Sequence, residues 1–397
     1  MGKNILYPLL FFLVILAGCN DNSTNNIFTT NNSPVWPQPG FNARNTSNPK
    51  SPYVYMNPVL QGVSDWSYLF PSGNFSDGGE FCVDSKGNIY YLNQLYPAGA
   101  LYKFRYDGTL VWKIDSLMQN NYCGISLSAD EKKIYLSAYK IQPYAEGLYC
   151  VDSGGTVNWF IPGCIGGAKP VIGRDGTIYT FKGGFLTAIS SYNNIVWTSP
   201  NITQVYTNTK ISLDEADNLY LTQNTGIVKA SKTNGDIIWQ FTSSSLTEGI
   251  VIDGFGNVYF NGYSNRTFYC LNKNGQLKWS KPNANQFSSP VISKDNIIFV
   301  STDNNIAAYD TAGNEIWKKP AFTDGGGAEG VMLDDEDNIY YIRDMSGITA
   351  GSLSKTGLFR WQTQIFNIGL TLPPPVLIPQ GKLLFAPKRA GKIQAVK

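Results

Sequence analysis

The amino-acid sequence predicts an all-β protein, a single eight-bladed β-propeller of four-stranded antiparallel blades. The first observation is a tryptophan that recurs at intervals of about 38 to 47 residues, a period typical of propellers with four short strands per repeat. The second is a repeated phrase of an apolar strand, an Asp/Asn/Gly turn and an alternating strand, with clear copies at residues 82–92, 171–181 and 251–261. No stretch shows a sustained helical period.

Each repeat supplies its four strands in a fixed order. The Asp/Asn/Gly turn joins the first two strands as a hairpin, and the aspartates at positions 84, 214, 253 and 334 are expected to support that turn locally. A third apolar strand follows, as in residues 147–152. The fourth strand carries the tryptophan, in phrases such as N-G-Q-L-K-W at residues 274–279.

The number of blades follows from counting the repeats. Seven complete repeats run from about Gly78 to Trp361. The stretch from Pro375 to the C-terminus holds three strands without a tryptophan strand, whereas S-D-W-S-Y-L-F around Trp66 is a tryptophan strand without the other three. We therefore expect the N-terminal strand to complete an eighth blade, because closing the ring removes an exposed sheet edge.

The tryptophans are interpreted as packing devices on the outer strands, wedged between neighbouring blades. A tryptophan buries on the order of 200 Å², and each blade must cover the face of its neighbour. A row of stacking platforms for sugars or bases is the functional alternative, but equivalent copies favour an architectural role. The set is Trp66, Trp112, Trp159, Trp197, Trp239, Trp279, Trp317 and Trp361.

The first residues have the layout of a secretory signal. Lys3 precedes an apolar run over residues 5–17, which is too short for a comfortable transmembrane helix. The run ends in L-A-G-C, which resembles the bacterial lipobox, so we expect a lipoprotein signal peptide over residues 1–18 and a lipid anchor, such as palmitate, on Cys19. Residues 19–33 are predicted to be a flexible tether and residues 34–397 the propeller. A simple signal peptide with an incidental cysteine is the alternative.

Composition excludes several classes of function. The chain contains no histidine, which excludes Ser-His-Asp and Cys-His catalysis and histidine ligation of metals or haem. The formal net charge is +2 and the Lys and Arg residues form no runs. Since nucleic-acid binding leaves a basic stripe, we expect no nucleic-acid partner.

These motifs resemble the pyrroloquinoline quinone-like (quinoprotein-type) repeat family over residues 34–397. The resemblance implies the propeller fold, but quinone dehydrogenases and non-catalytic scaffold lipoproteins share the repeat. Family dehydrogenases typically hold the quinone between a tryptophan and a disulfide of adjacent cysteines, together with calcium. This sequence has no adjacent cysteine pair and no haem-attachment motif, so we expect no catalytic residue, no cofactor and no metal site.

The cysteines after Cys19 are odd in number, so at least one is unpaired. Cys150 and Cys270 share the third-strand register and are expected to be buried apolar residues. Cys123 and Cys164 begin consecutive blades, and a disulfide between them stays open, as does any pairing of Cys82.

A candidate binding face follows from propeller geometry. The segments from each outer strand to the next inner strand crowd around the central channel, and the charged residues there are Glu80, Lys169, Lys210, Glu248 and Glu329. Tyr122 and the tyrosines of the longer loops over residues 93–100 and 138–147 are a candidate aromatic patch for a protein or glycan. Solvated loop charges, and tyrosines that pin long loops, are the alternatives.

Two classes of function compete. The first is a membrane-anchored, non-catalytic propeller lipoprotein that binds another protein of the cell envelope, similar in build to the scaffold lipoprotein of the outer-membrane β-barrel assembly machinery. The outer membrane is the expected location, with the periplasmic or surface side left open. The second is an exported enzyme, either a quinone-dependent dehydrogenase or a polysaccharide-active hydrolase or lyase. A pair of acidic residues facing the channel at glycosidase spacing would favour hydrolysis.

Overall fold

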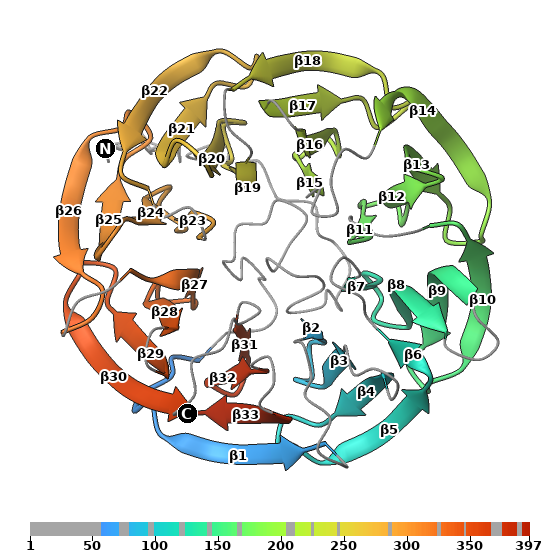
Figure 1. Ribbon diagram of the computed structural model, residues 1–397, viewed down its shortest axis with the longest axis horizontal. Helices are drawn as coiled ribbons and strands as arrows, with labels where there is room; N and C mark the ends of the chain where they lie inside the picture. Colours follow the sequence, from blue (N-terminus) through green and yellow to red (C-terminus); the bar gives the residue numbers. More distant parts are fainter. Residues whose placement is uncertain are drawn as a thin grey trace, which may run out of the picture.

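The structure is a computed structural model, and every regular element in the residues it describes is a β-strand. The strands form eight antiparallel sheets arranged in a ring (Figure 1), so the prediction of an all-β, eight-bladed propeller is confirmed. The described residues are 57–70, 79–93, 99–118, 124–140, 145–164, 169–203, 211–223, 226–243, 247–284, 288–323, 327–344, 347–366, 375–386 and 391–397.

Each blade contributes one strand to the wall of the central channel. These innermost strands are short, and most of their side chains are buried between neighbouring blades. In order around the ring they are β2 (Gly79–Val83), β7 (Ile125–Leu127), β11 (Val171–Ile172), β15 (Ile211–Leu213), β19 (Thr247–Ile252), β23 (Val291–Ile292), β27 (Glu329–Leu333) and β31 (Val376–Ile378). Blades 1 to 8 are numbered in this order.

Two strands lie in the middle of each blade and supply most of the buried residues. The second strands are β3 (Ile89–Asn93), β8 (Lys133–Lys140), β12 (Ile178–Lys182), β16 (Leu219–Gln223), β20 (Val258–Gly262), β24 (Ile298–Ser301), β28 (Ile339–Asp344) and β32 (Lys382–Phe385). The third strands are β4 (Ala100–Phe104), β9 (Ala145–Asp152), β13 (Phe185–Ile189), β17 (Gly226–Ala230), β21 (Thr267–Leu271), β25 (Asn305–Tyr309), β29 (Ile348–Leu353) and β33 (Lys392–Val396).

The fourth strands form the rim in Figure 1. Each carries its tryptophan next to an irregularity in pairing with the third strand, such as the shift between Lys229 and Ala230 opposite Trp239. A β-bulge of this kind redirects a side chain, and here it turns the indole toward the next blade. The outer strands are β5 (Leu110–Asp115), β10 (Val157–Pro162), β14 (Ile195–Thr203), β18 (Ile237–Thr242), β22 (Leu277–Pro282), β26 (Glu315–Pro320), β30 (Phe359–Phe366) and β1 (Ser64–Leu69).

Blade 2 departs from the four-stranded pattern. Its strands β8 and β9 are eight residues long, and the additional length of β8 pairs with the short strand β6 (Leu117–Met118). The sheet therefore has five strands. The sequence predicts a longer loop here, and the structure converts much of it into an extended hairpin.

The predicted Asp turns are built as expected from local hydrogen bonds. Asp214 accepts the backbone N–H groups of Ala216 and Asn218, both at 2.9 Å, and the Tyr220 hydroxyl at 3.2 Å. The same set of acceptor contacts recurs at Asp84, Asp253 and Asp334. These carboxylates are therefore occupied by their own turns.

The tryptophans tie each outer strand to the next blade. Seven of the indole N–H groups donate to a backbone carbonyl, at 2.8 to 3.2 Å, in the chain segment that borders the next blade. Trp159 packs instead against an apolar cluster shared by blades 2 and 3. A glycine of that segment lies against the ring: a Cβ at Gly275 would stand 2.7 Å from Trp239. The packing interpretation of the tryptophan repeat is thus supported by direct contacts.

The N-terminal and C-terminal strands lie in one sheet. β1 pairs antiparallel with β33, in the order β1-β33-β32-β31, and the two strands are neighbours at the rim in Figure 1. Residues 57–63, the lead-in segment, precede β1. Val63 and Lys397 exchange two backbone hydrogen bonds, so the lead-in segment takes the place of the turn that joins third and fourth strands elsewhere.

The antiparallel order gives the ring two unlike faces. The turn face carries the tight turns between first and second strands and between third and fourth strands. The connection face carries the links between second and third strands and between successive blades. Because the predicted binding residues lie just before the innermost strands or at their first residues, they belong to the connection face.

Candidate binding face

The structure describes the side chains of two of the predicted binding residues. Glu80 lies in β2 and Lys169 lies just before β11. Glu248 and Glu329 lie in β19 and β27, but the description there covers only their backbones. Tyr122 and Lys210, like the predicted lipidation site Cys19, lie outside the described residues.

Glu80 and Lys169 form an ion pair that spans three blades. They belong to blades 1 and 3, and the innermost strand of blade 2 lies between them. The lysine side chain crosses the backbone of blade 2 at Gly124, where an added Cβ would collide with the Lys169 Cγ. The missing side chain of Gly124 therefore makes the pair possible. The opposite charges of these two predicted binding residues therefore neutralise each other within the fold.

The same three innermost strands are joined by side chains that donate to backbone carbonyls. The Cys82 thiol donates to the Ile125 carbonyl at 3.0 Å, and the Ser126 hydroxyl donates to the Pro170 carbonyl at 2.5 Å. Both carbonyls belong to the neighbouring blade. Ser212 makes the equivalent contact to Ile250 at 3.1 Å. The wall of the channel is thus joined laterally as well as through the tryptophans at the rim.

Residues that lead into the innermost strands overlap their neighbours around the channel. Ser289 lies over Gly249 of the preceding blade, and Pro375 lies over Gly330, as Lys169 lies over Gly124. In each case a glycine in one blade leaves room for the side chain of the next. The variable residues found from the sequence therefore have a packing role in addition to any role in recognition.

The cysteines that the structure describes lie inside the core. Cys82, Cys150, Cys164 and Cys270 are buried, which supports the apolar interpretation of Cys150 and Cys270. Burial raises the pKa of Cys150 and Cys164 to about 11 and that of Cys270 to about 12. Such thiols are poor nucleophiles near neutral pH. Cys123, the partner considered for Cys164, lies outside the described residues.

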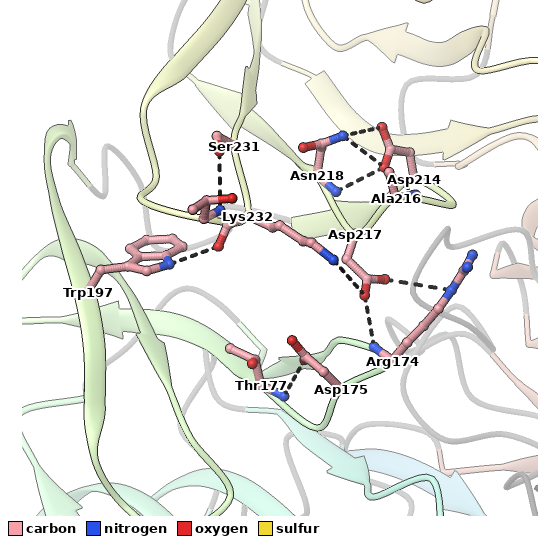
Figure 2. Close-up of polar contacts among 11 residues, drawn as sticks. Arg174, Asp175, Thr177, Trp197, Asp214, Ala216, Asp217, Asn218, Ser231 and Lys232 are labelled. Atoms are coloured by element: carbon pink, nitrogen blue, oxygen red, sulfur yellow. Dashed lines mark hydrogen bonds and ion pairs between the residues drawn. The ribbon is translucent and has the colours of Figure 1, made fainter.

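Charged side chains on the turn face connect neighbouring blades (Figure 2). Asp217 accepts the backbone N–H of Arg174 in blade 3 at 3.1 Å, and its carboxylate also faces the Arg174 guanidinium and the Lys232 ammonium at 3.8 and 4.0 Å. The carbonyl of Lys232 receives the indole N–H of Trp197. Backbone and side chain of one lysine thus link the tryptophan of blade 3 to the Asp turn of blade 4.

Within the described parts of the chain, no group of three or more His, Cys, Asp or Glu side chains is arranged to hold a metal ion. A search of the same residues also finds no helix of the length and apolarity needed to cross a membrane.

Two aromatic residues that the sequence analysis did not single out pack the closing strand β1 against blade 1. Tyr68 and Phe70 follow Trp66, and their rings contact Tyr102 at centroid distances of 6.3 and 5.2 Å. Phe70 also stacks on Tyr91 at 5.7 Å. The alternation of W-S-Y-L-F was the available signal, because residues 66, 68 and 70 share one face of a strand.

Comparison with known proteins supports the repeat type. Residues 223–368, from the end of β16 to just beyond β30, match the family described as outer membrane protein assembly factor BamB, a PQQ-like family. The repeats in this stretch are PQQ-like. The predicted resemblance to the quinoprotein-type repeat is therefore confirmed. A search of curated proteins gave no match.

Solved structures share the propeller fold of this chain. BamB from Moraxella catarrhalis has a TM-score of 0.59 and 11% identity, covering 84% of this chain and 97% of that protein. A catalytically inactive virginiamycin B lyase from Staphylococcus aureus, solved with quinupristin, has a TM-score of 0.52 and 15% identity, covering 71% and 97%. A streptogramin B lyase has a TM-score of 0.51 and 15% identity, covering 69% and 92%. At such identities the likeness concerns the fold alone.

Proposed function

We propose that this chain is a membrane-anchored, non-catalytic propeller lipoprotein that acts as a protein-binding scaffold in the cell envelope, at the outer membrane. The observation that carries the proposal is the match of residues 223–368 to a family described as an outer membrane protein assembly factor. The lipobox-like sequence that ends at Cys19 agrees with it. The partner in this proposal is an envelope protein bound at the connection face.

The chemistry of the described residues favours binding over catalysis. The Asp turns use their carboxylates in local hydrogen bonds, the described thiols are buried, and Glu80 is paired with Lys169. An exported enzyme is the alternative, since a lyase shares the fold. However, the virginiamycin B lyase variant that is called catalytically inactive has one histidine replaced by alanine, whereas this chain contains no histidine.

The lipid anchor is tested by replacing its attachment residue. We expect Cys19→Ser to yield protein that a salt wash releases from membranes, because acyl chains supply the apolar anchor. Metabolic labelling with a palmitate analogue and detergent phase partitioning measure the outcome. Wild-type protein that takes up no lipid, or Cys19→Ser protein that still partitions with detergent, would contradict the anchor.

The scaffold role is tested by exchanging the two charges on the channel wall. The double variant Glu80→Lys/Lys169→Glu keeps an ion pair across Gly124, so we expect its melting temperature to stay near that of the wild type. A partner that contacts these charges at the connection face meets them reversed. We therefore expect stoichiometric recovery of an envelope protein with wild-type membranes and its loss with the double variant.

One result would count against the scaffold, and another against the place where it binds its partner. Recovery of no stoichiometric partner by the wild type in mild detergent contradicts the proposal itself. Equal recovery by the double variant, with an unchanged melting temperature, contradicts recognition through Glu80 and Lys169 and leaves the pair as a purely structural brace.

A further inference from the structure

We propose that the turn face of the propeller rests on the lipid bilayer, so that the connection face is directed away from the membrane. The first observation is the place where the chain joins the fold. Asn57 contacts the turn between β31 and β32: its backbone N–H and its side-chain amide donate to the Pro379 carbonyl at 3.3 and 2.7 Å. The described part of the chain therefore begins, at Asn57, on the turn face.

The second observation is a set of exposed apolar side chains on that same face. Tyr192 is 81% exposed at the tip of the turn between β13 and β14, and Phe255 is 66% exposed at the tip of the turn between β19 and β20. Leu60, in the lead-in segment, and Leu358, just before the outer strand of blade 7, are 71% and 67% exposed. Tyr106 is 44% exposed in a turn of blade 1.

The backbone geometry of a tight turn gives no reason for an exposed aromatic residue or leucine at these positions. Residues in such turns are favoured for local hydrogen bonding or for a positive φ, so polar residues and glycine dominate. The neighbouring turns follow this rule, with Lys273 and Asn274 at the tip of the turn between β21 and β22. An exposed phenylalanine or leucine at these positions contributes little to folding and favours contact with an apolar phase.

The set is spread around the ring rather than gathered on one blade. Tyr106, Tyr192, Phe255 and Leu358 come from blades 1, 3, 5 and 7, and Leu60 lies between blades 7 and 8. A compact protein partner would meet a few of them, whereas a flat surface meets them together. This distribution favours a bilayer as the occupant.

Two of the tyrosines carry an ammonium group against the ring. The Lys133 Nζ lies 5.6 Å from the centre of the Tyr192 ring, and the Lys382 Nζ lies 5.5 Å from that of Tyr106. An aromatic ring with a polar tip and an adjacent lysine suits the headgroup level of a membrane, where one end is apolar and the other wet. Acidic side chains such as Asp175 and Asp295 also lie on this face, so apolar insertion rather than net charge drives the contact.

The inference rests on the proposed lipid anchor. Once Cys19 is lipidated, contact between turn face and bilayer is intramolecular, and weak apolar contacts suffice because the local concentration of the surface is high. This orientation determines on which side of the propeller the proposed scaffold binds its partner. Its partner is bound through a part that lies in the aqueous compartment, on the side of the propeller opposite the membrane.

The test compares matched probes on the two faces of the lipidated full-length protein in phosphatidylcholine vesicles. Phe255→Cys lies on the turn face, and Phe185→Cys, at the 40% exposed start of β13, lies on the connection face. Both are made in a Cys123→Ser background and labelled with an environment-sensitive fluorophore. We expect the label at position 255 to shift to the blue and to be quenched by spin-labelled lipid, while the label at position 185 does neither.

A second variant measures the contribution of the apolar tips. Tyr192→Ser/Leu358→Ser in the Phe255→Cys protein should weaken the contact about tenfold or more, since two of the side chains that bury apolar surface in the bilayer are replaced by polar ones, and so reduce quenching at position 255. Equal quenching at positions 255 and 185, or unchanged quenching in this variant, would overturn the inference. Protein that a salt wash removes from the vesicles would instead refute the lipid anchor.

Discussion

Asp214 and Asp217 show how strongly residue surroundings differ within a single turn. Burial acts to raise the pKa of Asp214, but the ion pair with Lys229 at 2.9 Å and the hydrogen bonds from Asn218 lower it below its usual 3.8. Burial of Asp217 outweighs the N–H of Arg174 and the charges of Arg174 and Lys232, so that its pKa is raised. The two carboxylates therefore contribute to stability with opposite dependence on pH.

Asparagine substitutions at these positions should reveal the opposite signs. The stabilisation from Asp214 is fully present above pH 3.8 and is lost as pH falls through its lowered pKa, so the cost of Asp214→Asn shrinks as pH falls below 3.8. The contribution of Asp217 is fully present below pH 3.8 and is lost as pH rises through its raised pKa, so the cost of Asp217→Asn shrinks as pH rises above 3.8. Denaturant unfolding at pH values on both sides of 3.8 measures both effects. Parallel pH profiles would show that the carboxylates experience similar surroundings.

The ion pair across Gly124 gives a second prediction at the residue scale. Lys169→Met leaves the Glu80 carboxylate, 11% exposed, without its cation, and removing one partner of a largely buried polar contact costs about 1–3 kcal/mol. Lys113→Met is the matched control, because the pair of Lys113 and Asp115 is 45% and 67% exposed and such surface pairs contribute about 0–1 kcal/mol. Chemical denaturation compares the two variants. If both variants lose an equally small free energy of unfolding, the pair of Glu80 and Lys169 is solvated like a surface pair.

At the scale of elements, the outer strand and the next turn form one packing unit. The bulge beside the tryptophan directs seven of the indoles onto a backbone carbonyl and a glycine in the segment that borders the next blade, as Trp239 lies on Lys273 and Gly275. Gly275 has a φ of +80°, and its ring contact leaves no room for a side chain. The repeat thus couples an element of one blade to an element of its neighbour without any long loop.

The two demands on this glycine are separable by mutation. Gly176 has nearly the same φ, +81°, but a Cβ added there would meet open space, with no neighbouring atom within 4 Å. Gly176→Ala should therefore lose only the backbone preference, about 1 kcal/mol. Gly275→Ala should lose that amount and roughly 1–3 kcal/mol more from overpacking against Trp239. Thermal unfolding of the two variants decides between a shared backbone effect and a specific contact with the indole.

For the molecule as a whole, the decisive junction is the one between its two ends. The lead-in segment reproduces the contacts of an ordinary turn, because the Val59 carbonyl receives the indole N–H of Trp361 at 2.9 Å and its N–H donates to the Tyr340 hydroxyl at 2.9 Å. Trp66 of β1 continues the series by donating to the Tyr106 carbonyl of blade 1 at 3.0 Å. A single apolar cluster joins blades 7, 8 and 1 across this seam.

Removing the closing strand should therefore affect the whole ring. We expect Trp66→Ala to lower the melting temperature about as much as Trp239→Ala, because both indoles are partly buried against the core. Truncating a fully buried aromatic costs about 3–5 kcal/mol of the roughly 5–15 kcal/mol that stabilises a domain, which sets the upper limit for both variants. Deleting residues 19–70 exposes the edge of β33 and the aromatic side chains of blade 1, which favours association. Deleting residues 20–33 is the control and should change little. A silent Trp66→Ala, with a stable monomeric 19–70 deletion, would contradict closure by β1.

The sequence by itself determined the strand order, the blade number and the structural use of the aspartates and tryptophans. These features are local or periodic: turn chemistry and alternation act over a few residues, and the repeat multiplies the signal. It also located Glu80 and Lys169 in equivalent positions of blades 1 and 3, although only the structure shows them in contact.

The tertiary structure alone decided which equivalent positions meet. Glu80 and Lys169 are 89 residues apart, and their contact depends on the missing side chain of Gly124 in the blade between them. The contacts of Tyr68 and Phe70 with blade 1 likewise depend on the closing of the ring, which brings distant parts of the chain together. A repeat places many similar residues at the same register, so its pattern cannot specify which pair forms. The three-dimensional packing of neighbouring blades selects the pair, because only there do side-chain reach and the space left by glycine coincide.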